Sequence, residues 1–160
     1  MKLLVLGIGN VLMNDDAAGA LVVRSLEEKY ADADENLRVI EGGTLGLDLL
    51  PLLEWADRLV LADAVDLDLP AGTVVKIEGE DVSPVFENKL SPHQMGMKDM
   101  LLTAELAGYR PPEVILYGIQ VKSIQMDMTL SPEVAENCPK LRKYLEDEIE
   151  NFLSARAGTE

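Results

Sequence analysis

Cysteine, histidine, aromatic and basic residues are all scarce in this chain. Its 160 residues include one cysteine, one histidine and 4% aromatic residues, and 14 Lys and Arg stand against 29 Asp and Glu, for a formal net charge of −15. The lone Cys138 cannot make an internal disulfide or a thiolate zinc site, which fits a reducing compartment. Nucleic acids and anionic membranes bind clusters of Lys and Arg, so the charge argues against both as partners.

Long apolar runs are also absent. No stretch approaches the roughly 18 residues of a membrane span. The N-terminus imitates a signal peptide, with Lys2 before an apolar stretch, but Gly7, Gly9 and Asn10 interrupt that stretch. We therefore expect a cytoplasmic protein, and we expect a monomer.

The pattern of apolar residues predicts an α/β fold. The length suits a single domain over residues 1–160, and hydrophobic residues make up 48% of it. Strand and helix patterns alternate, which predicts a three-layer sandwich: an about five-stranded, mostly parallel, twisted sheet with helices on both faces. The expected strands are residues 3–8, 37–40, 59–62, 73–77 and 114–119. The connection 68–72 is too short for a crossover helix, so the fourth strand should be an antiparallel edge.

Four helical segments are expected between these strands. The first should be capped by Asn14 or Asp15, and a short second one should pass through residues 47–53. Ser91 and Pro92 should begin a third helix that runs to about Ala107. The last begins at residues 131–133 and should kink or restart at Pro139, because proline removes one backbone hydrogen bond.

The glycine pair after the first strand suggests a dinucleotide site that the neighbouring residues contradict. The sequence Gly7-Ile8-Gly9 lacks the third glycine of the fingerprint, since Leu12 stands in its place. No Gly-Lys-Ser/Thr phosphate loop is present either. Asp15 and Asp16 would repel a pyrophosphate from the following helix and attract a cation. No nucleotide partner is therefore expected.

Three residues form a candidate metal site. Asp16 follows the first strand, Asp63 follows the third, and His93 begins a helix. Each also has a structural explanation. Asp16 could cap a helix, Asp63 could bind loop amides, and His93 could be a plain surface residue. Ligands of parallel sheets bind beyond the carboxyl ends of the strands, where all three could meet. Two carboxylates and one imidazole suit zinc, nickel or manganese, with positions open for a substrate.

Four short segments in order carry a more specific signal. They are residues 4–12 (LVLGIGNVL) followed by Asp15, Asp16 and Gly19, then 41–44 (EGGT), 62–64 (ADA) and 88–94 (NKLSPHQ). Together they resemble the motifs of the nickel–iron hydrogenase maturation endopeptidases, over nearly the whole chain. Any one segment is weak, but four in order are specific.

The resemblance implies an activity. Members of this family remove a C-terminal peptide from the hydrogenase large-subunit precursor after nickel has been inserted. The family's metal-contacting positions fall on Asp16, Asp63 and His93. The first position is Glu or Asp in the family, with Asp15 as the alternative here. Glu41 stands where members often carry Asp.

The resemblance leads to a hypothesis of mechanism. No protease triad is evident, because one histidine would have to serve any nucleophile and Cys138 lies beside Pro139. We expect nickel to arrive with the substrate, although zinc or another divalent metal could bind the isolated protein. Asp16, Asp63 and His93 would engage the nickel, and water activated by the metal or a carboxylate would attack the peptide bond.

The segment Glu41, Gly42, Gly43 and Thr44 is expected to grip the substrate, unless it is only a tight turn. Two other functions remain open. One is a nickel-checking chaperone that binds the precursor without cutting it. The other is a small-molecule metallohydrolase, which would bind metal tightly and act without a protein partner.

Overall fold

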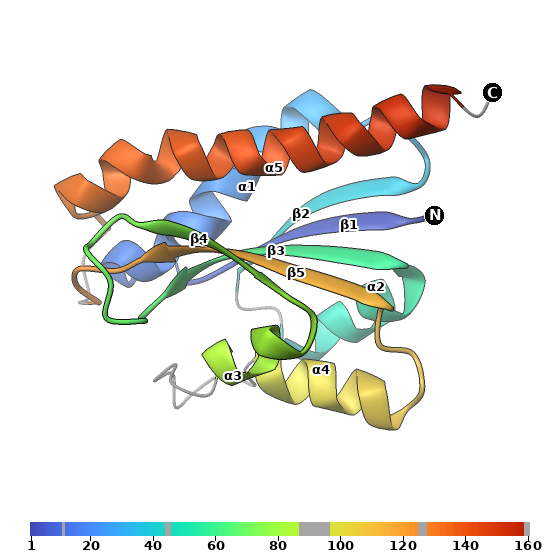
Figure 1. Cartoon of the computed structure of the whole chain (residues 1–160), viewed down its shortest axis with the longest axis horizontal. Helices are drawn as coiled ribbons and strands as arrows, with labels where there is room; N and C mark the ends of the chain where they lie inside the picture. Colours follow the sequence, from blue (N-terminus) through green and yellow to red (C-terminus); the bar gives the residue numbers. More distant parts are fainter. Residues whose placement is uncertain (11, 44–45, 87–96, 125–127, 159–160) are drawn as a thin grey trace.

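One five-stranded sheet organises the chain, with helices on both of its faces (Figure 1). The computed structural model describes residues 1–10, 12–43, 46–86, 97–124 and 128–158. The strands are β1 (Leu3–Ile8), β2 (Leu37–Gly43), β3 (Arg58–Val65), β4 (Val74–Glu78) and β5 (Glu113–Gln120). The helices are α1 (Ala18–Tyr30), α2 (Leu50–Trp55), α3 (Val82–Phe86), α4 (Met97–Leu106) and α5 (Pro132–Gly158), with single 3-10 turns at η1 (Asn14–Ala17), η2 (Gly46–Leu49) and η3 (Gly79–Asp81).

The strand order is β2-β1-β3-β5-β4, and the pairing is parallel except at one edge. β1 pairs in parallel with β2 and β3, and β3 with β5. β4 pairs antiparallel with β5, as its short connection to β3 predicted. The expected sandwich with a mostly parallel sheet is therefore confirmed.

Two hydrophobic cores lie on opposite faces of the sheet. Helices α1 and α5 cover one face and α2, α3 and α4 cover the other (Figure 1). Successive side chains of a strand point to opposite faces, so β3 serves both cores. Val60 and Ala62 contribute to the α1 and α5 side, and Leu61 and Val65 to the other. The continuous apolar runs of the sequence thus reflect burial on both faces.

Helix α5 runs through Pro139 without a break, so the predicted restart there is wrong. Pro139 is exposed, and water can therefore reach the Ala135 carbonyl that loses its partner. Leu141, Leu145 and Ile149 are fully buried along one stripe and hold the helix on the sheet.

No helix within the described ranges has the length and apolarity to cross a membrane.

Element ends differ from expectation by a few residues. β3 extends to Val65, so Asp63 lies inside the strand rather than beyond it. The first helical region opens with η1, and neither Asn14 nor Asp15 caps α1, whose N-cap Ala17 has no side-chain hydrogen bond. The predicted helix start at Ser91 and Pro92 lies outside the described residues.

Gly19 sets the distance between α1 and the sheet and gives a first prediction. A Cβ at Gly19 would lie 2.2 Å from the Ala62 carbonyl oxygen, a backbone atom that cannot move aside alone. Gly19→Ala should therefore lower the free energy of unfolding by about 1–3 kcal/mol, despite alanine's better helix propensity. Urea unfolding measures this change.

Gly158→Ala is the matched control for Gly19→Ala. A Cβ at Gly158, near the end of α5, meets nothing within 4 Å. This variant should be neutral or slightly stabilised. Equal stability of the two variants would show that the contact between α1 and β3 is not tight.

Candidate active site at the carboxyl ends of the strands

Glycines let the segment after β1 approach the end of β3 closely. η1 packs against β3, and α1 begins directly after η1. Gly9 has φ +139°, and a Cβ there would lie 1.9 Å from the Asp16 carbonyl oxygen. A Cβ on Gly19 would collide with both Ala62 and Asp63. The backbones that carry Asp16 and Asp63 are thus brought together by residues without side chains.

Asp63 is a fully buried carboxylate inside β3. Its backbone lies beside Gly118 of β5, and its Oδ1 accepts a hydrogen bond from the Ala64 N–H at 2.8 Å. Strand alternation gives its side chain the same direction as those of Leu61 and Val65, toward α3 and α4. The carboxylate therefore points into the layer opposite α1.

Asp16 is partly buried and belongs to η1. Its Oδ2 accepts a hydrogen bond from the Asn10 N–H at 3.0 Å. This bond fixes the carboxylate against the loop that leaves β1. Asp16 and Asp63 thus lie on contacting elements at the same rim of the sheet.

Asp15 has a different role from its neighbour. Its side chain is fully buried and accepts four hydrogen bonds: from the N–H groups of Lys122 (2.9 Å), Ser123 (3.0 Å) and Ser131 (2.7 Å), and from Ser131 Oγ (2.8 Å). The Asp15 N–H also donates to the Ser123 carbonyl at 3.3 Å, and Asn14 Nδ2 donates to the Thr129 carbonyl. Asp15 therefore joins η1 to the connection between β5 and α5, and it is not the alternative ligand that the sequence suggested.

These hydrogen bonds decide the protonation of Asp15. Burial by itself raises the pKa of its carboxyl, but hydrogen bonds from Ser131, Lys122 and Ser123 together lower it below the ordinary value of 3.8. Asp15 is therefore ionised at neutral pH. Burial, and the Asp15 charge to a smaller extent, raise the pKa of the Cys138 thiol. A raised pKa disfavours the reactive thiolate, in line with our view that Cys138 is no nucleophile.

Of the other predicted site residues, three belong to the described strand β2 and two lie outside the described residues. Glu41 and Gly42 lie at the end of β2, where Glu41 Oε1 binds Arg24 at 2.7 Å, and Gly43 is the last residue of that strand. His93 and Thr44 lie outside the described residues, and their approach to the carboxylates stays a prediction. Within the described ranges, no three His, Cys, Asp or Glu side chains are grouped so as to hold a metal ion.

Lys122, Ser123 and Ser131 help to build this rim, although the sequence did not predict it. Their contribution is mostly through backbone N–H groups, which leave no trace in residue type. Only Ser131 had a signal, because Ser before Pro132 marks a helix start. Its hydroxyl also binds Asp15, 116 positions earlier in the chain.

Comparisons with known proteins agree on one family. A family model described as hydrogenase maturation protease (HycI) matches residues 20–148. The chain is 37% identical over 156 residues to the Hydrogenase 2 maturation protease of Escherichia coli K12, covering 97% of this chain and 90% of that protein. It is 42% identical over 137 residues to the hydrogenase expression/formation protein HupD of Rhodobacter capsulatus, covering 84% of this chain but only 64% of that protein.

Solved structures show the same fold. The E. coli hydrogenase maturating endopeptidase HybD superposes with a TM-score of 0.82 at 30% identity, covering 94% of this chain and 93% of that one. The [NiFe] hydrogenase maturation protease HybD of Thermococcus kodakarensis gives a TM-score of 0.74 at 32% identity, covering 92% and 98%.

Asp15→Asn should destabilise the fold by about 2–4 kcal/mol, because an amide cannot accept from four donors and its NH₂ would face other N–H groups. The pKa is lowered on folding, so the ionised form stabilises the fold above the unfolded value of 3.8 and this contribution disappears as the pH falls below it. The difference between wild type and variant should therefore narrow in urea unfolding below about pH 4.

Asp32→Asn is the control for this variant, because Asp32 is exposed and accepts no hydrogen bond in the described part of the chain. It should leave the free energy of unfolding unchanged. A pH-independent difference for Asp15→Asn would contradict the assigned ionisation.

Proposed function

The chain belongs to the hydrogenase maturation protease family, and we propose that it removes the C-terminal peptide from a nickel–iron hydrogenase large-subunit precursor once nickel has been inserted. The nickel belongs to the substrate in this proposal. Asp16, Asp63 and His93 would contact it, so that cleavage tests whether insertion has taken place. The catalysed step is hydrolysis of one peptide bond near the precursor's C-terminus.

The direction of Asp63 carries this proposal. Its carboxylate points toward the layer formed by α2, α3 and α4. The segment that holds His93 follows α3, which ends at Phe86, and precedes α4, which begins at Met97. Phe86 and Met100 pack in the same core as Leu61. Both ends of this segment are thus anchored on the face toward which Asp63 points.

Asp16 supplies the second carboxylate of the proposed set. It belongs to η1, which packs against β3, and its hydrogen bond from Asn10 holds it at the rim. Two carboxylates and an imidazole are oxygen and nitrogen ligands, which suit a divalent first-row metal. The set leaves coordination positions open, as recognition of a metal that already has ligands on the precursor requires.

The reaction itself needs an activated water. Water adds to the carbonyl carbon of the scissile bond, the C–N bond breaks, and the departing amine takes up a proton. A carboxylate that is not protonated can accept the proton of the attacking water as a general base. We assign this to Asp63 or Asp16, because Asp15 is held by four hydrogen bonds and Cys138 has a raised pKa.

Intact-mass analysis of a cognate precursor tests the proposal directly. Incubation of the nickel-loaded precursor with this protein should remove one defined C-terminal peptide, whereas the nickel-free precursor should keep its full mass. Binding of the loaded precursor without loss of mass would instead establish the chaperone alternative. Neither binding nor cleavage, with a precursor that another maturation protease cuts, would refute the proposal.

His93→Ala and Asp16→Asn should each reduce the rate of peptide release by on the order of 10²-fold or more, since each removes one of the proposed nickel contacts. Their melting temperatures should stay near that of the wild type. Asp16→Glu is the matched control and should retain processing, because the family accepts Glu at this position. A large loss of thermal stability in His93→Ala would assign His93 a structural role instead.

A further inference from the structure

We infer that the outer edge of β2 binds the precursor's C-terminal segment as an added strand and leads it to the carboxyl rim. This inference rests on the proposed function, because it takes the precursor as the substrate. It concerns how the peptide is held, which the proposed ligands alone do not explain.

β2 lies at the edge of the sheet, and among the strands that the structure describes it pairs with β1 alone. Leu3 N–H donates to the Asn36 carbonyl, and Leu4 is aligned with Arg38. In a parallel ladder, alternate residues face the partner strand, so residues 36, 38 and 40 turn their backbone groups toward β1. Residues 37, 39 and 41 turn theirs outward.

The hydrogen bonds at both ends of β2 agree with this assignment. The Leu37 N–H donates to the Asp34 carbonyl at 3.2 Å, and the Glu41 N–H donates to Glu27 Oε1 at 3.1 Å. Val39 lies between them. Its N–H and C=O point away from the sheet and meet no partner in the described part of the chain. An extended peptide aligned with Val39 would satisfy both groups.

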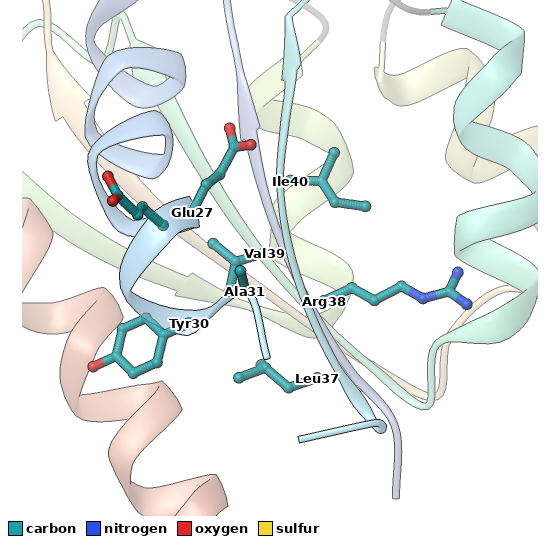
Figure 2. Close-up of a pocket in the computed structure, with 8 residues that line it drawn as sticks. Glu27, Tyr30, Ala31, Leu37, Arg38, Val39 and Ile40 are labelled. Carbon is teal, nitrogen blue, oxygen red and sulfur yellow. The ribbon is translucent and has the colours of Figure 1, made fainter. Parts of the chain in front are cut away.

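A groove follows this edge on the side of α1. It has a volume of about 440 Å³ and lies between α1 and β2 (Figure 2). Leu37, Val39 and Ala31 give it an apolar lining, and Glu27 and Glu28 make one wall acidic. Alternate side chains of an added strand would enter this groove, and the groove would accept apolar or basic ones.

The other side of the same edge has different chemistry. Figure 2 shows Arg38 and Ile40 pointing away from α1, opposite to Val39. The Arg38 guanidinium lies 4.2 Å from the centre of the Trp55 ring. Arg38 makes no ion pair within the described ranges. The remaining side chains of an added strand would meet this cation and the neighbouring apolar surface.

The direction of β2 connects the groove to the candidate active site. β2 runs parallel to β1, and both end at the rim that holds Asp16. Its last residues include Glu41, Gly42 and Gly43, which the sequence predicted to contact substrate. A peptide paired with β2 would therefore be carried along these residues to the carboxylates. An endopeptidase must present its scissile bond in an extended segment, and edge pairing holds a segment in that form.

Charge favours this occupant over a second copy of the chain. Pairing β2 with its counterpart would bring two acidic groove walls together on molecules that each carry −15. The bond from Glu41 N–H to Glu27 also shortens the open part of the edge, as in natural edge strands that avoid self-association. A single short segment needs only the open part of the edge at Val39, and it brings no second acidic groove wall.

Val39→Pro tests the backbone contact. Proline removes the outward N–H and leaves the ladder with β1 intact, since position 39 does not bond to β1. KM for the nickel-loaded precursor should rise about tenfold or more, as expected for loss of one hydrogen bond with a steric block, while kcat changes less than about twofold. Lys76→Pro is the matched control. The backbone N–H and C=O of Lys76 point outward on β4, at the opposite edge of the sheet, so this variant should leave KM unchanged.

Ala31→Trp tests the groove without touching β2, in case Val39→Pro does not fold. It should raise KM for the same precursor by a similar factor. Ala33→Trp, an exposed position outside the groove, should leave KM unchanged.

Unchanged KM in folded Val39→Pro, or in Ala31→Trp, would overturn the inference while peptide release by the wild type still upheld the proposed function. A rise in KM in Lys76→Pro as large as in Val39→Pro, or in Ala33→Trp as large as in Ala31→Trp, would also overturn it. A wild-type dimer in light scattering that Val39→Pro converts to monomer would assign the edge to self-association instead. Absence of peptide release by the wild type would refute the proposed function itself.

Discussion

The approach of the chain after β1 to the end of β3 is the constraint on which the rim of the sheet depends. Gly9 and Gly19 have no Cβ, and at either position a Cβ would overlap backbone atoms within 2.2 Å. Any side chain at Gly19 would push α1 away from Ala62 and Asp63. The two glycines therefore allow close backbone packing, and this packing places Asp16 beside the strand that carries Asp63.

Adjacent carboxylates at this rim have opposite roles, and the difference lies in their partners. Asp15 is saturated by donors from the connection after β5, which makes that connection and η1 one unit. Asp16 instead accepts a hydrogen bond from the Asn10 N–H, in the loop after β1. A rigid neighbour limits how far Asp16 can move, so Asp15 supports the position of the carboxylate that we propose to contact nickel.

Sequence reasoning succeeded where one residue type implies one environment. Continuous apolar runs predicted β1, β3 and β5, because strands buried on both faces leave few polar positions. It failed where residues far away in the sequence determine the environment of a side chain. Nothing local separates Asp15 from Asp16, since the donors to Asp15 come from more than 100 positions away. Pro139 was expected to kink or restart α5. The helix is continuous, because the freed carbonyl is exposed to water and buried side chains hold the helix on the sheet before and after Pro139. The approach of His93 to the carboxylates remains a prediction.

The glycine pair shows how one backbone geometry serves ligands of opposite charge. In dinucleotide-binding folds, N–H groups of the glycine loop and the start of the next helix bind phosphate. In this chain the Asn10 N–H, which directly follows Gly9, donates instead to the chain's own Asp16 carboxylate. The position where a phosphate would lie is thus occupied by a fixed negative charge. The close packing of helix on strand is retained, but the electrostatic preference of the rim is reversed from anions to cations, which is the preference that the proposed recognition of a nickel-loaded precursor requires.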